Sequence, residues 1–180
     1  MNLQFRPSNM PPPEPLVRVI LASQSVGRKT LLEKLGISFR TAIARIDEDK
    51  ITDPDPIKTI RKRAAAKAAE VFEHPRMYAL SEEGKHLVVA ADSMAILGKK
   101  AFGKAKDKDD ERAMLKALMG KTHTFVTAMQ VVLLEGHTVK KQWEKLEKTR
   151  VTLRKLTIPE LESYVTRYDF SRFAAGYSLN

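Results

Sequence analysis

Two serines followed by an arginine form the first group in this sequence that could do chemistry. Ser23 and Ser25 come directly after the apolar run 16–22, and Arg28 stands three residues beyond Ser25. A turn from a strand into a helix points free backbone N–H groups and the positive helix end at one spot, which favours a phosphate. Arg28 could hold such an anion through two parallel hydrogen bonds. The glycines of a Walker loop are missing, so ordinary helix capping beside a surface arginine is the alternative.

Three carboxylates form a second group. Asp47 and Glu48 lie in an acidic turn, and Asp92 directly follows the apolar run 87–91. Carboxylates at strand ends suit a hard cation such as Mg²⁺, which often bridges to substrate phosphates, and one of them could activate a water molecule. A solvated turn is the alternative for residues 47–49. A carboxylate beside a buried strand needs a partner, which makes that alternative weaker for Asp92.

Basic residues that could offset phosphate charge form a third group. Arg63 and Lys67 are four residues apart and would share one face of a helix, and Lys104 follows Gly103 in an expected loop. Each of them could equally be a surface residue. The histidines show no metal-binding spacing, and we interpret them as structural.

The elements that would position these groups alternate along the chain. Branched apolar runs predict strands, and apolar residues at helical spacing with capping signals predict helices. The expected order is a strand over 16–22, a helix ending at Gly36, a strand over 37–46, a helix from 56, a strand over 87–91, a short hairpin strand over 95–97, a helix over 107–119, two long strands over 124–134 and 138–153, and a helix after a capping box at Thr157 and Glu160. This order predicts an α/β fold with a mixed sheet. Ligands of such sheets bind at the carboxyl ends of strands, where we expect Ser23, Asp47 and Asp92.

The composition limits the class of protein. The chain has 180 residues, 43% of them hydrophobic, and no cysteine, which excludes a disulfide scaffold and a thiol nucleophile. A net charge of +10 favours polyanionic partners, although a solvated lysine surface would give the same value. We interpret residues 1–15 as a disordered, proline-rich extension that lacks the order of a signal peptide, and residues 16–180 as one domain. We expect a cytoplasmic protein without a membrane span.

Taken together and in this order, the motifs resemble the Maf family of nucleoside triphosphate pyrophosphatases. The similar segments are ILASQSVGRKTLLEKLGISF (20–39), Ile46-Asp47-Glu48, Arg63-Ala-Ala-Ala-Lys67, Val89-Ala-Ala-Asp92-Ser93, Gly103-Lys104, Met119-Gly-Lys-Thr-His123, a strand containing Thr127, and Ala174-Ala-Gly-Tyr-Ser178. Each motif is modest alone, but their common order over 16–180 is specific.

The resemblance implies a fold, an activity and a site. The fold would be a mixed, elongated sheet flanked by helices (Maf- or ITPase-like), with two lobes around a cleft, in a homodimer. The activity would be hydrolysis of nucleoside triphosphates, pyrimidine or non-standard ones, to monophosphate and pyrophosphate with Mg²⁺ or Mn²⁺; nucleic acid is not an expected partner. The implied residues are Asp92, Lys67 and Lys104 for catalysis, Ser23, Ser25 and Arg28 for phosphate binding, and Glu48 with Asp92 for the metal.

Three positions depart from the family pattern where it determines base choice. Gly27 replaces an arginine or tryptophan, Ser93 replaces a threonine or glutamine, and Asn180 replaces a glutamine or glutamate. Because serine keeps a hydroxyl and asparagine an amide, the pyrimidine branch is favoured. Family members also continue past the position of Asn180, so we expect a truncated C-terminus. The net charge of +10 and the departures at Gly27 and Asn180 motivate an alternative function, a catalytically weak module that binds nucleotides or nucleic acid.

Overall fold

A long, mixed sheet is the frame of the molecule. The structure, a computed structural model, describes residues 17–170 and 172–178. The strands are β1 (Val17–Leu21), β2 (Phe39–Thr41), β3 (Lys85–Leu97), β4 (Lys100–Phe102), β5 (Thr122–Glu135) and β6 (Thr138–Thr152). The helices are α1 (Val26–Lys34), α2 (Pro56–Glu73), α3 (Lys108–Leu118), α4 (Ile158–Arg167) and the short 3₁₀ helix η1 (Glu48–Lys50). The predicted order of strands and helices is therefore confirmed.

The sheet changes from parallel to antiparallel at its centre. The strand order is β2-β1-β3-β5-β6, with β4 paired to β3. Strands β1, β2 and β3 run parallel, as expected of strands connected through helices, whereas β5 and β6 continue from β3 in antiparallel direction. The two parts share β3, which carries residues of the candidate site.

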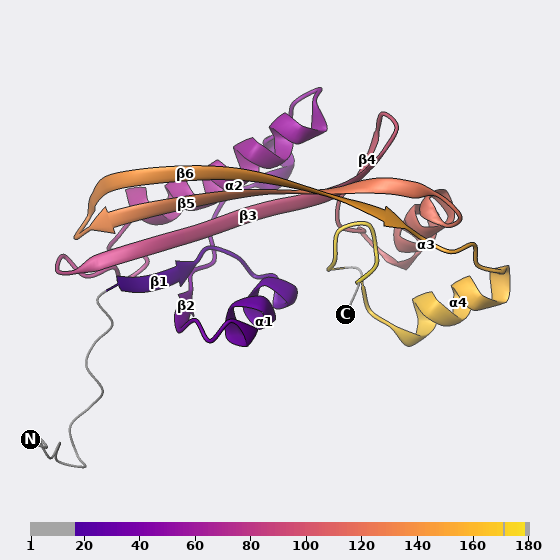
Figure 1. Ribbon diagram of the computed structural model, residues 1–180, viewed down its shortest axis with the longest axis horizontal. Coiled ribbons are helices and arrows are strands. Elements are labelled where there is room, and N and C mark those ends of the chain that lie inside the picture. The colour runs from indigo at the N-terminus through magenta and orange to yellow at the C-terminus, as the bar shows by residue number, and fades with distance from the viewer. Residues whose placement is uncertain (1–16, 171, 179–180) are drawn as a thin grey trace, which may run out of the picture.

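Helices cover the two faces of the sheet at different places. Even-numbered β3 residues such as Val88 and Ala90 pack against Ala68 and Val71 of α2. Odd-numbered Ala95 lies in a separate core cluster with α3 and α4. This alternation follows from the period of two in a strand. Figure 1 shows α1 and β2 nearer one end of the long strands and α3 and α4 at the other end.

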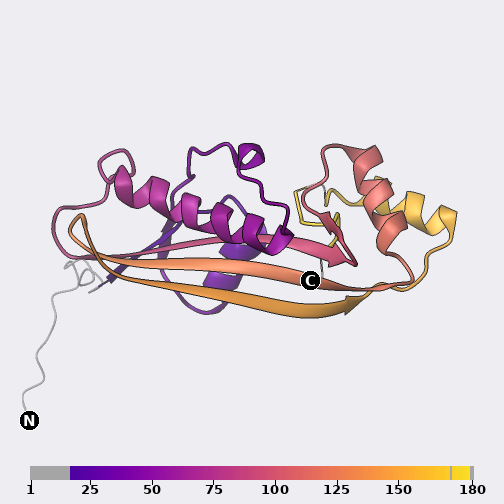
Figure 2. The ribbon, with the colours of Figure 1, turned by 90° about the horizontal axis from the view of Figure 1, so that it is seen from above.

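The two groups of elements form two lobes on one sheet. We call β1, β2, α1 and α2 the first lobe, and β4, α3 and α4 the second lobe. Figure 2 shows the long strands β3, β5 and β6 running past α2 toward α3 and α4. The expected mixed α/β architecture with two lobes is thus present.

Two predicted strand boundaries were wrong. The strand expected over 37–46 is only Phe39–Thr41, because β1 offers it only the three partners Val19–Leu21 before turning into α1. The strands expected over 87–91 and 95–97 are one strand, β3, because β5 pairs with it continuously from Lys85 to Ile96. Asp92 therefore lies inside a strand rather than at its end.

Candidate active site

A gap in the sheet creates the candidate site. On one edge of β3, β1 pairs with residues as far as Val89, and β4 pairs with residues from Ala95 onward. Between them no strand pairs with residues 90–94 on that edge, within the described part of the chain. We call this gap the notch. It lies between the lobes, and it carries Asp92 and Ser93, whose side chains point to opposite faces of β3.

The serine turn closes the first-lobe side of the notch. Ser25 caps α1 in extended conformation, and its Oγ accepts a hydrogen bond from the backbone N–H of Arg28 at 3.5 Å. The backbone N–H of Ser25 donates to Ser23 Oγ at 3.2 Å. The turn predicted from the sequence is present, and it holds both hydroxyls at the positive end of α1.

Arg28 connects this turn to β3. Its Nη1 donates to Ser23 Oγ at 3.0 Å and its Nη2 donates to Ser93 Oγ at 2.9 Å. Burial lowers the pKa of the guanidinium, whereas the charges of Asp92 and Glu48 act in the opposite direction. A charged guanidinium thus lies beside two carboxylates, so it is not the surface arginine of the alternative interpretation.

Lys67 joins the two carboxylates predicted to act together. Its Nζ lies 2.7 Å from Glu48 Oε2 and 3.0 Å from Asp92 Oδ1. Lys67 and Asp92 are each only 7% exposed, so Asp92 has the partner that its burial requires. Helix α2 supplies Lys67 from the face opposite Ser93, since its buried stripe packs on β3.

Glu48 is held in a strongly positive environment. Burial alone would raise the pKa of its carboxyl group. The hydrogen bond and charge of Lys67, together with the charges of Lys104 and Arg63, outweigh burial and leave the pKa below its ordinary value. Glu48 is consequently ionised at neutral pH and can attract a further cation.

Lys104 reaches the notch from the second lobe. It forms a β-bridge with Ala174, and the Ala175 N–H donates to the Gly103 carbonyl at 2.6 Å. This pairing fixes the loop after β4 against the C-terminal segment. Arg63 is held differently, through a hydrogen bond from Nε to the Ile51 carbonyl at 3.0 Å.

Two neighbouring cavities occupy the notch. The smaller, about 130 Å³, is lined by the serine turn, Arg28, Glu48, Lys67 and Lys104. The larger, about 490 Å³, is lined by residues that include Asp92, Ser93 and Arg63. Glu48 and Lys104 line both cavities, so the two cavities adjoin. One ligand could therefore place a phosphate in the smaller cavity and the rest of the molecule in the larger one.

The predicted site residues differ in how they are placed. The residues brought together around the notch are Ser23, Ser25, Arg28, Glu48, Lys67, Asp92, Ser93 and Lys104. Asp47 also lines the larger cavity, but its carboxylate caps η1 and pairs with Lys50 at 3.4 Å. Gly27 lies near the Phe173 ring, which is 3.9 Å from the position of an added Cβ. Asn180 and the extension 1–15 lie outside the described residues.

One residue beside the site had no role in the sequence interpretation. Thr127 Oγ1 lies 2.9 Å from Ser93 Oγ across the β3–β5 pair. Only the register of these two strands brings the hydroxyls together, and local motifs do not contain that register. A predicted pairing of 87–97 with 124–134 would have been the signal.

The donor set of the site fits a hard cation only in part. Glu48 and Asp92 offer carboxylate oxygens close enough to share one ammonium, and Mg²⁺ commonly takes one or two carboxylates and completes its shell with water and phosphate. No group of three or more histidine, cysteine, aspartate or glutamate side chains is placed for a metal within residues 17–170 and 172–178. A metal here would therefore depend on the substrate for further ligands.

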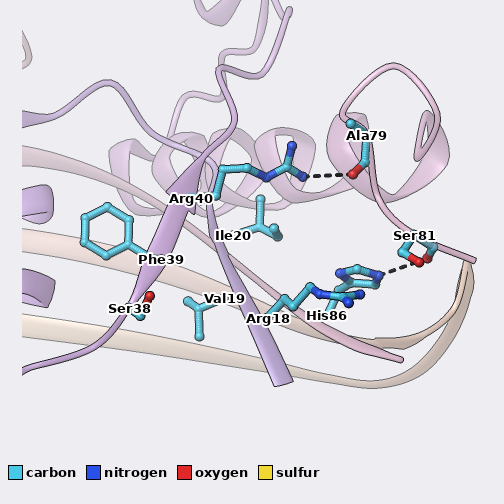
Figure 3. Close-up of a pocket in the computed structure, with 9 residues that line it drawn as sticks. All are labelled: Arg18, Val19, Ile20, Ser38, Phe39, Arg40, Ala79, Ser81 and His86. Carbon is cyan, nitrogen blue, oxygen red and sulfur yellow. Dashed lines mark hydrogen bonds between the residues drawn. The ribbon is translucent and has the colours of Figure 1, made fainter. Parts of the chain in front are cut away.

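A cavity of similar size elsewhere lacks the groups for this chemistry. It measures about 450 Å³ and lies beside the first half of β1, where Figure 3 shows Arg18, Arg40 and His86 around it. Arg40 donates to the Ala79 carbonyl, and His86 Nε2 lies 3.0 Å from the Ser81 carbonyl. Neither a carboxylate nor a lysine lines it, so the two notch cavities remain the candidate site.

Comparisons with known proteins find similar sequences over most of this chain. A family model described as Maf-like protein matches residues 18–180. A dTTP/UTP pyrophosphatase of Aquifex aeolicus is 36% identical over 163 residues, 91% of this chain and 78% of that protein. A dTTP/UTP pyrophosphatase of Agathobacter rectalis is 32% identical over 167 residues, 90% of this chain and 81% of that protein. A 7-methyl-GTP pyrophosphatase of Cupriavidus pinatubonensis is 32% identical over 152 residues, 84% of this chain and 70% of that protein. The matched region contains both lobes and the notch between them.

Proposed function

Because this chain belongs to the Maf-like protein family, we propose that it hydrolyses nucleoside triphosphates to nucleoside monophosphates and pyrophosphate. The observation that carries this proposal is the meeting of two groups in one notch. Ser23 and Arg28 present donors for phosphate, and directly beside them Lys67 holds the carboxylates Glu48 and Asp92. Phosphoryl transfer needs this combination of charge stabilisation and positioning more than it needs covalent chemistry.

The proposed reaction uses Asp92 as the base. Asp92 orients a water molecule and accepts its proton while the water oxygen attacks the α-phosphorus. The bond from the α-phosphorus to the bridging oxygen breaks, and pyrophosphate leaves with the bonding electron pair. Ser23, Ser25 and Arg28 would hold phosphate oxygens, and Lys67 and Lys104 would offset the charge that develops on the leaving group.

A divalent metal, Mg²⁺ or Mn²⁺, is part of the proposal. Glu48 and Asp92 would hold it together with phosphate oxygens, and it would supply charge neutralisation. Lys67 contacts the same two carboxylates. Its ammonium would add positive charge beside the metal.

We propose pyrimidine nucleotides as the preferred substrates. Relatives named dTTP/UTP pyrophosphatase and 7-methyl-GTP pyrophosphatase both align with this chain, so similarity alone does not choose between them. Ser93 supports the pyrimidine choice, because its hydroxyl lies in the notch where the pyrimidine branch has a threonine hydroxyl.

We also propose a homodimer in the cytoplasm. Exposed apolar side chains, Val26 and Leu31 on α1 and Leu35 at its C-cap, support a second copy as partner, since helix α1 has no buried residue of its own. Sedimentation velocity would measure the oligomeric state. Within the described residues, no helix has the length and apolar character needed to span a bilayer.

Pyrophosphate release is the measurement that tests the proposed function. Canonical and modified nucleoside triphosphates are incubated with Mg²⁺ or with EDTA, using wild type and Asp92→Asn. We expect metal-dependent release that falls by about 10²–10⁴-fold in the variant, the usual contribution of a general base. Asp109→Asn is the matched control, because it removes the same charge from a fully exposed side chain on α3. Turnover by Asp92→Asn within about threefold of wild type would rule out the general-base role.

A binding module without catalysis is the second candidate function. The net charge of +10 and the departure from the family pattern at Gly27 favour it, because Gly27 lies beside Ser25 in the phosphate turn. Nucleotide binding by wild type without pyrophosphate release from any substrate would support this function instead.

A further inference from the structure

We infer that Thr127 is a positioning residue for the reaction, which fixes the Arg28 guanidinium through the hydroxyl of Ser93. This inference rests on the proposed function, because it concerns how the same site holds a triphosphate. Neither the family motifs nor the names of relatives assign a role to Thr127.

The evidence is a continuous chain of polar contacts across three elements. Arg28 Nη2 donates to Ser93 Oγ at 2.9 Å, and Ser93 Oγ lies 2.9 Å from Thr127 Oγ1. The other terminal nitrogen of Arg28 donates to Ser23 at 3.0 Å. One end of the guanidinium is therefore tied to the turn after β1, and the other end is tied to the β3–β5 pair.

The direction of the protons gives Thr127 its role. A guanidinium has only donors, so Ser93 Oγ must be the acceptor in its contact with Arg28. The proton on the Ser93 hydroxyl is then available for Thr127 Oγ1. A serine side chain alone can turn between rotamers, but threonine is β-branched and has few χ1 choices. Thr127 thus holds the Ser93 hydroxyl in the orientation that accepts from Arg28.

The sheet makes this anchor rigid. Ser93 and Thr127 are direct partners within a pairing of β3 and β5 that runs from Lys85 to Ile96. Strand β5 is also paired with β6 along its whole length, from Thr122 to Glu135. Arg28, by contrast, lies on a nine-residue helix with no buried residue. The hydrogen bonds through Ser93 and Thr127 therefore tie Arg28, on the weakly packed helix α1, to the rigid centre of the sheet.

The consequence is a preorganised phosphate clamp. Arg28 has five N–H donors in a fixed plane, and two nitrogens are engaged with hydroxyls. Its other N–H groups keep a fixed direction toward the ligand cavity that Arg28 lines. A fixed fork recognises phosphate oxygens with less loss of side-chain freedom than a mobile one.

Removal of the Thr127 hydroxyl should weaken phosphate binding by Arg28 while all the proposed phosphate-binding residues remain present. We expect Thr127→Val, which keeps the branched shape, to lower kcat/KM for nucleoside triphosphates by about 10-fold or more, since small misplacements in a site can cost up to ~10²-fold. Thr127→Ser keeps the hydroxyl but loses the branch that limits its rotamers, so its loss should be smaller than that of Thr127→Val. Thr122→Val is the matched control, because it breaks a similar contact on the same strand, with Thr152 Oγ1 at 2.7 Å.

A double-mutant cycle separates positioning from general stability. If Thr127 acts through Ser93, Thr127→Val should cost almost nothing in a Ser93→Ala background. An equal loss in both backgrounds, or a loss in Thr122→Val as large as in Thr127→Val, would overturn the inference. Thermal unfolding of each variant shows whether the protein remains folded.

A binding measurement keeps the inference distinct from the proposed function. The same variants are titrated with α,β-methylene UTP and α,β-methylene GTP by calorimetry. If wild type binds an analogue but hydrolyses nothing, the proposed function is wrong, and a weaker affinity of Thr127→Val would still support the positioning role. Equal affinity of wild type and Thr127→Val would overturn that role. If wild type binds neither analogue and hydrolyses nothing, both are wrong.

Discussion

At the scale of single residues, Lys67 determines the charge of the acidic half of the site. One ammonium serves two carboxylates, so Glu48 and Asp92 together with Lys67 carry one net negative charge. Such an arrangement is costly to break, because a buried carboxylate without its partner loses both hydration and attraction. Lys67 is thus expected to matter for stability as well as for the reaction.

The variant Lys67→Met tests this dependence through pH. In wild type the pKa of Glu48 is below its ordinary value of 4.5, so its ion pair stabilises the fold above about pH 4.5 and this contribution disappears as the pH falls through the lowered pKa. Without Lys67, burial remains and the pKa of Glu48 should rise. We expect Lys67→Met to lower the free energy of unfolding by about 2–4 kcal/mol at pH 7, less than a fully buried charge would cost. On acidification, the variant should lose less additional stability than wild type.

Urea unfolding of Lys67→Met between pH 3 and 7 provides that measurement. Lys50→Met is the matched control, since it removes a lysine paired with Asp47 that is 85% exposed. A parallel pH dependence in Lys67→Met and wild type would contradict the assigned electrostatics of Glu48.

Residue identities were easier to predict than their contacts. Local motifs placed Ser23, Arg28 and the acidic residues at strand ends, and the structure brings most of them to one notch. Helical spacing indicated that Lys67 shares a face with Arg63, but not that this face meets Glu48 and Asp92. Contacts between segments 19–44 residues apart depend on tertiary packing, which short-range patterns do not contain.

At the scale of elements, β3 explains why Asp92 was misplaced. A carboxylate after an apolar run usually ends a buried strand, because burial of its charge is unfavourable. Here the strand continues through Asp92, because β5 pairs with this part of β3 and Lys67 of α2 pairs with the buried carboxylate. The rule that ligands bind where strands end still holds for β1, whose end opens the notch.

The C-terminal segment is attached to β5 by a buried pair, His123 and Tyr177. His123 Nε2 lies 2.6 Å from the Tyr177 hydroxyl, and its Nδ1 has no hydrogen-bond partner within the described residues. Burial lowers the pKa of His123 and raises the pKa of Tyr177 to about 12. The same segment bridges to Lys104, so this pair supports one wall of the site.

We expect Tyr177→Phe to lower the free energy of unfolding by about 1–3 kcal/mol, the usual cost of a buried polar group left without its partner. The pH dependence of wild type should have a defined sign. Because the folded pKa of His123 is below the ordinary 6.5, the unfolded chain binds the proton more readily, and stability falls as the pH drops below about 6.5.

Chemical denaturation of wild type and Tyr177→Phe from pH 5 to 8 checks both statements. Tyr168→Phe is the matched control, because Tyr168 is 45% exposed. A Tyr177→Phe protein as stable as wild type would show that the contact with His123 contributes nothing.

At the scale of the whole molecule, the site exists because two lobes share one sheet but leave part of β3 uncovered. The first lobe supplies the serine turn and Lys67, and the second supplies Lys104. Alternation of elements predicted the mixed sheet and its helices. The notch was not predictable from local patterns, because it results from where β1 stops and β4 begins along β3.

The charge of the whole chain gives the last prediction, which separates the enzyme from a nucleic-acid-binding module. A net charge of +10 would attract any polyanion at low salt. Binding to duplex DNA through many phosphates should fall steeply, by about 10³-fold or more between 50 and 200 mM salt. A nucleotide held by the few cations of the notch releases fewer ions, so its KM should rise less than about tenfold over the same range. Fluorescence anisotropy with a 20-bp duplex and pyrophosphate release, measured in the same buffers, test this difference. Duplex binding with this steep salt dependence, without nucleotide turnover in any of the buffers, would mean that the chain is a nucleic-acid-binding module rather than an enzyme.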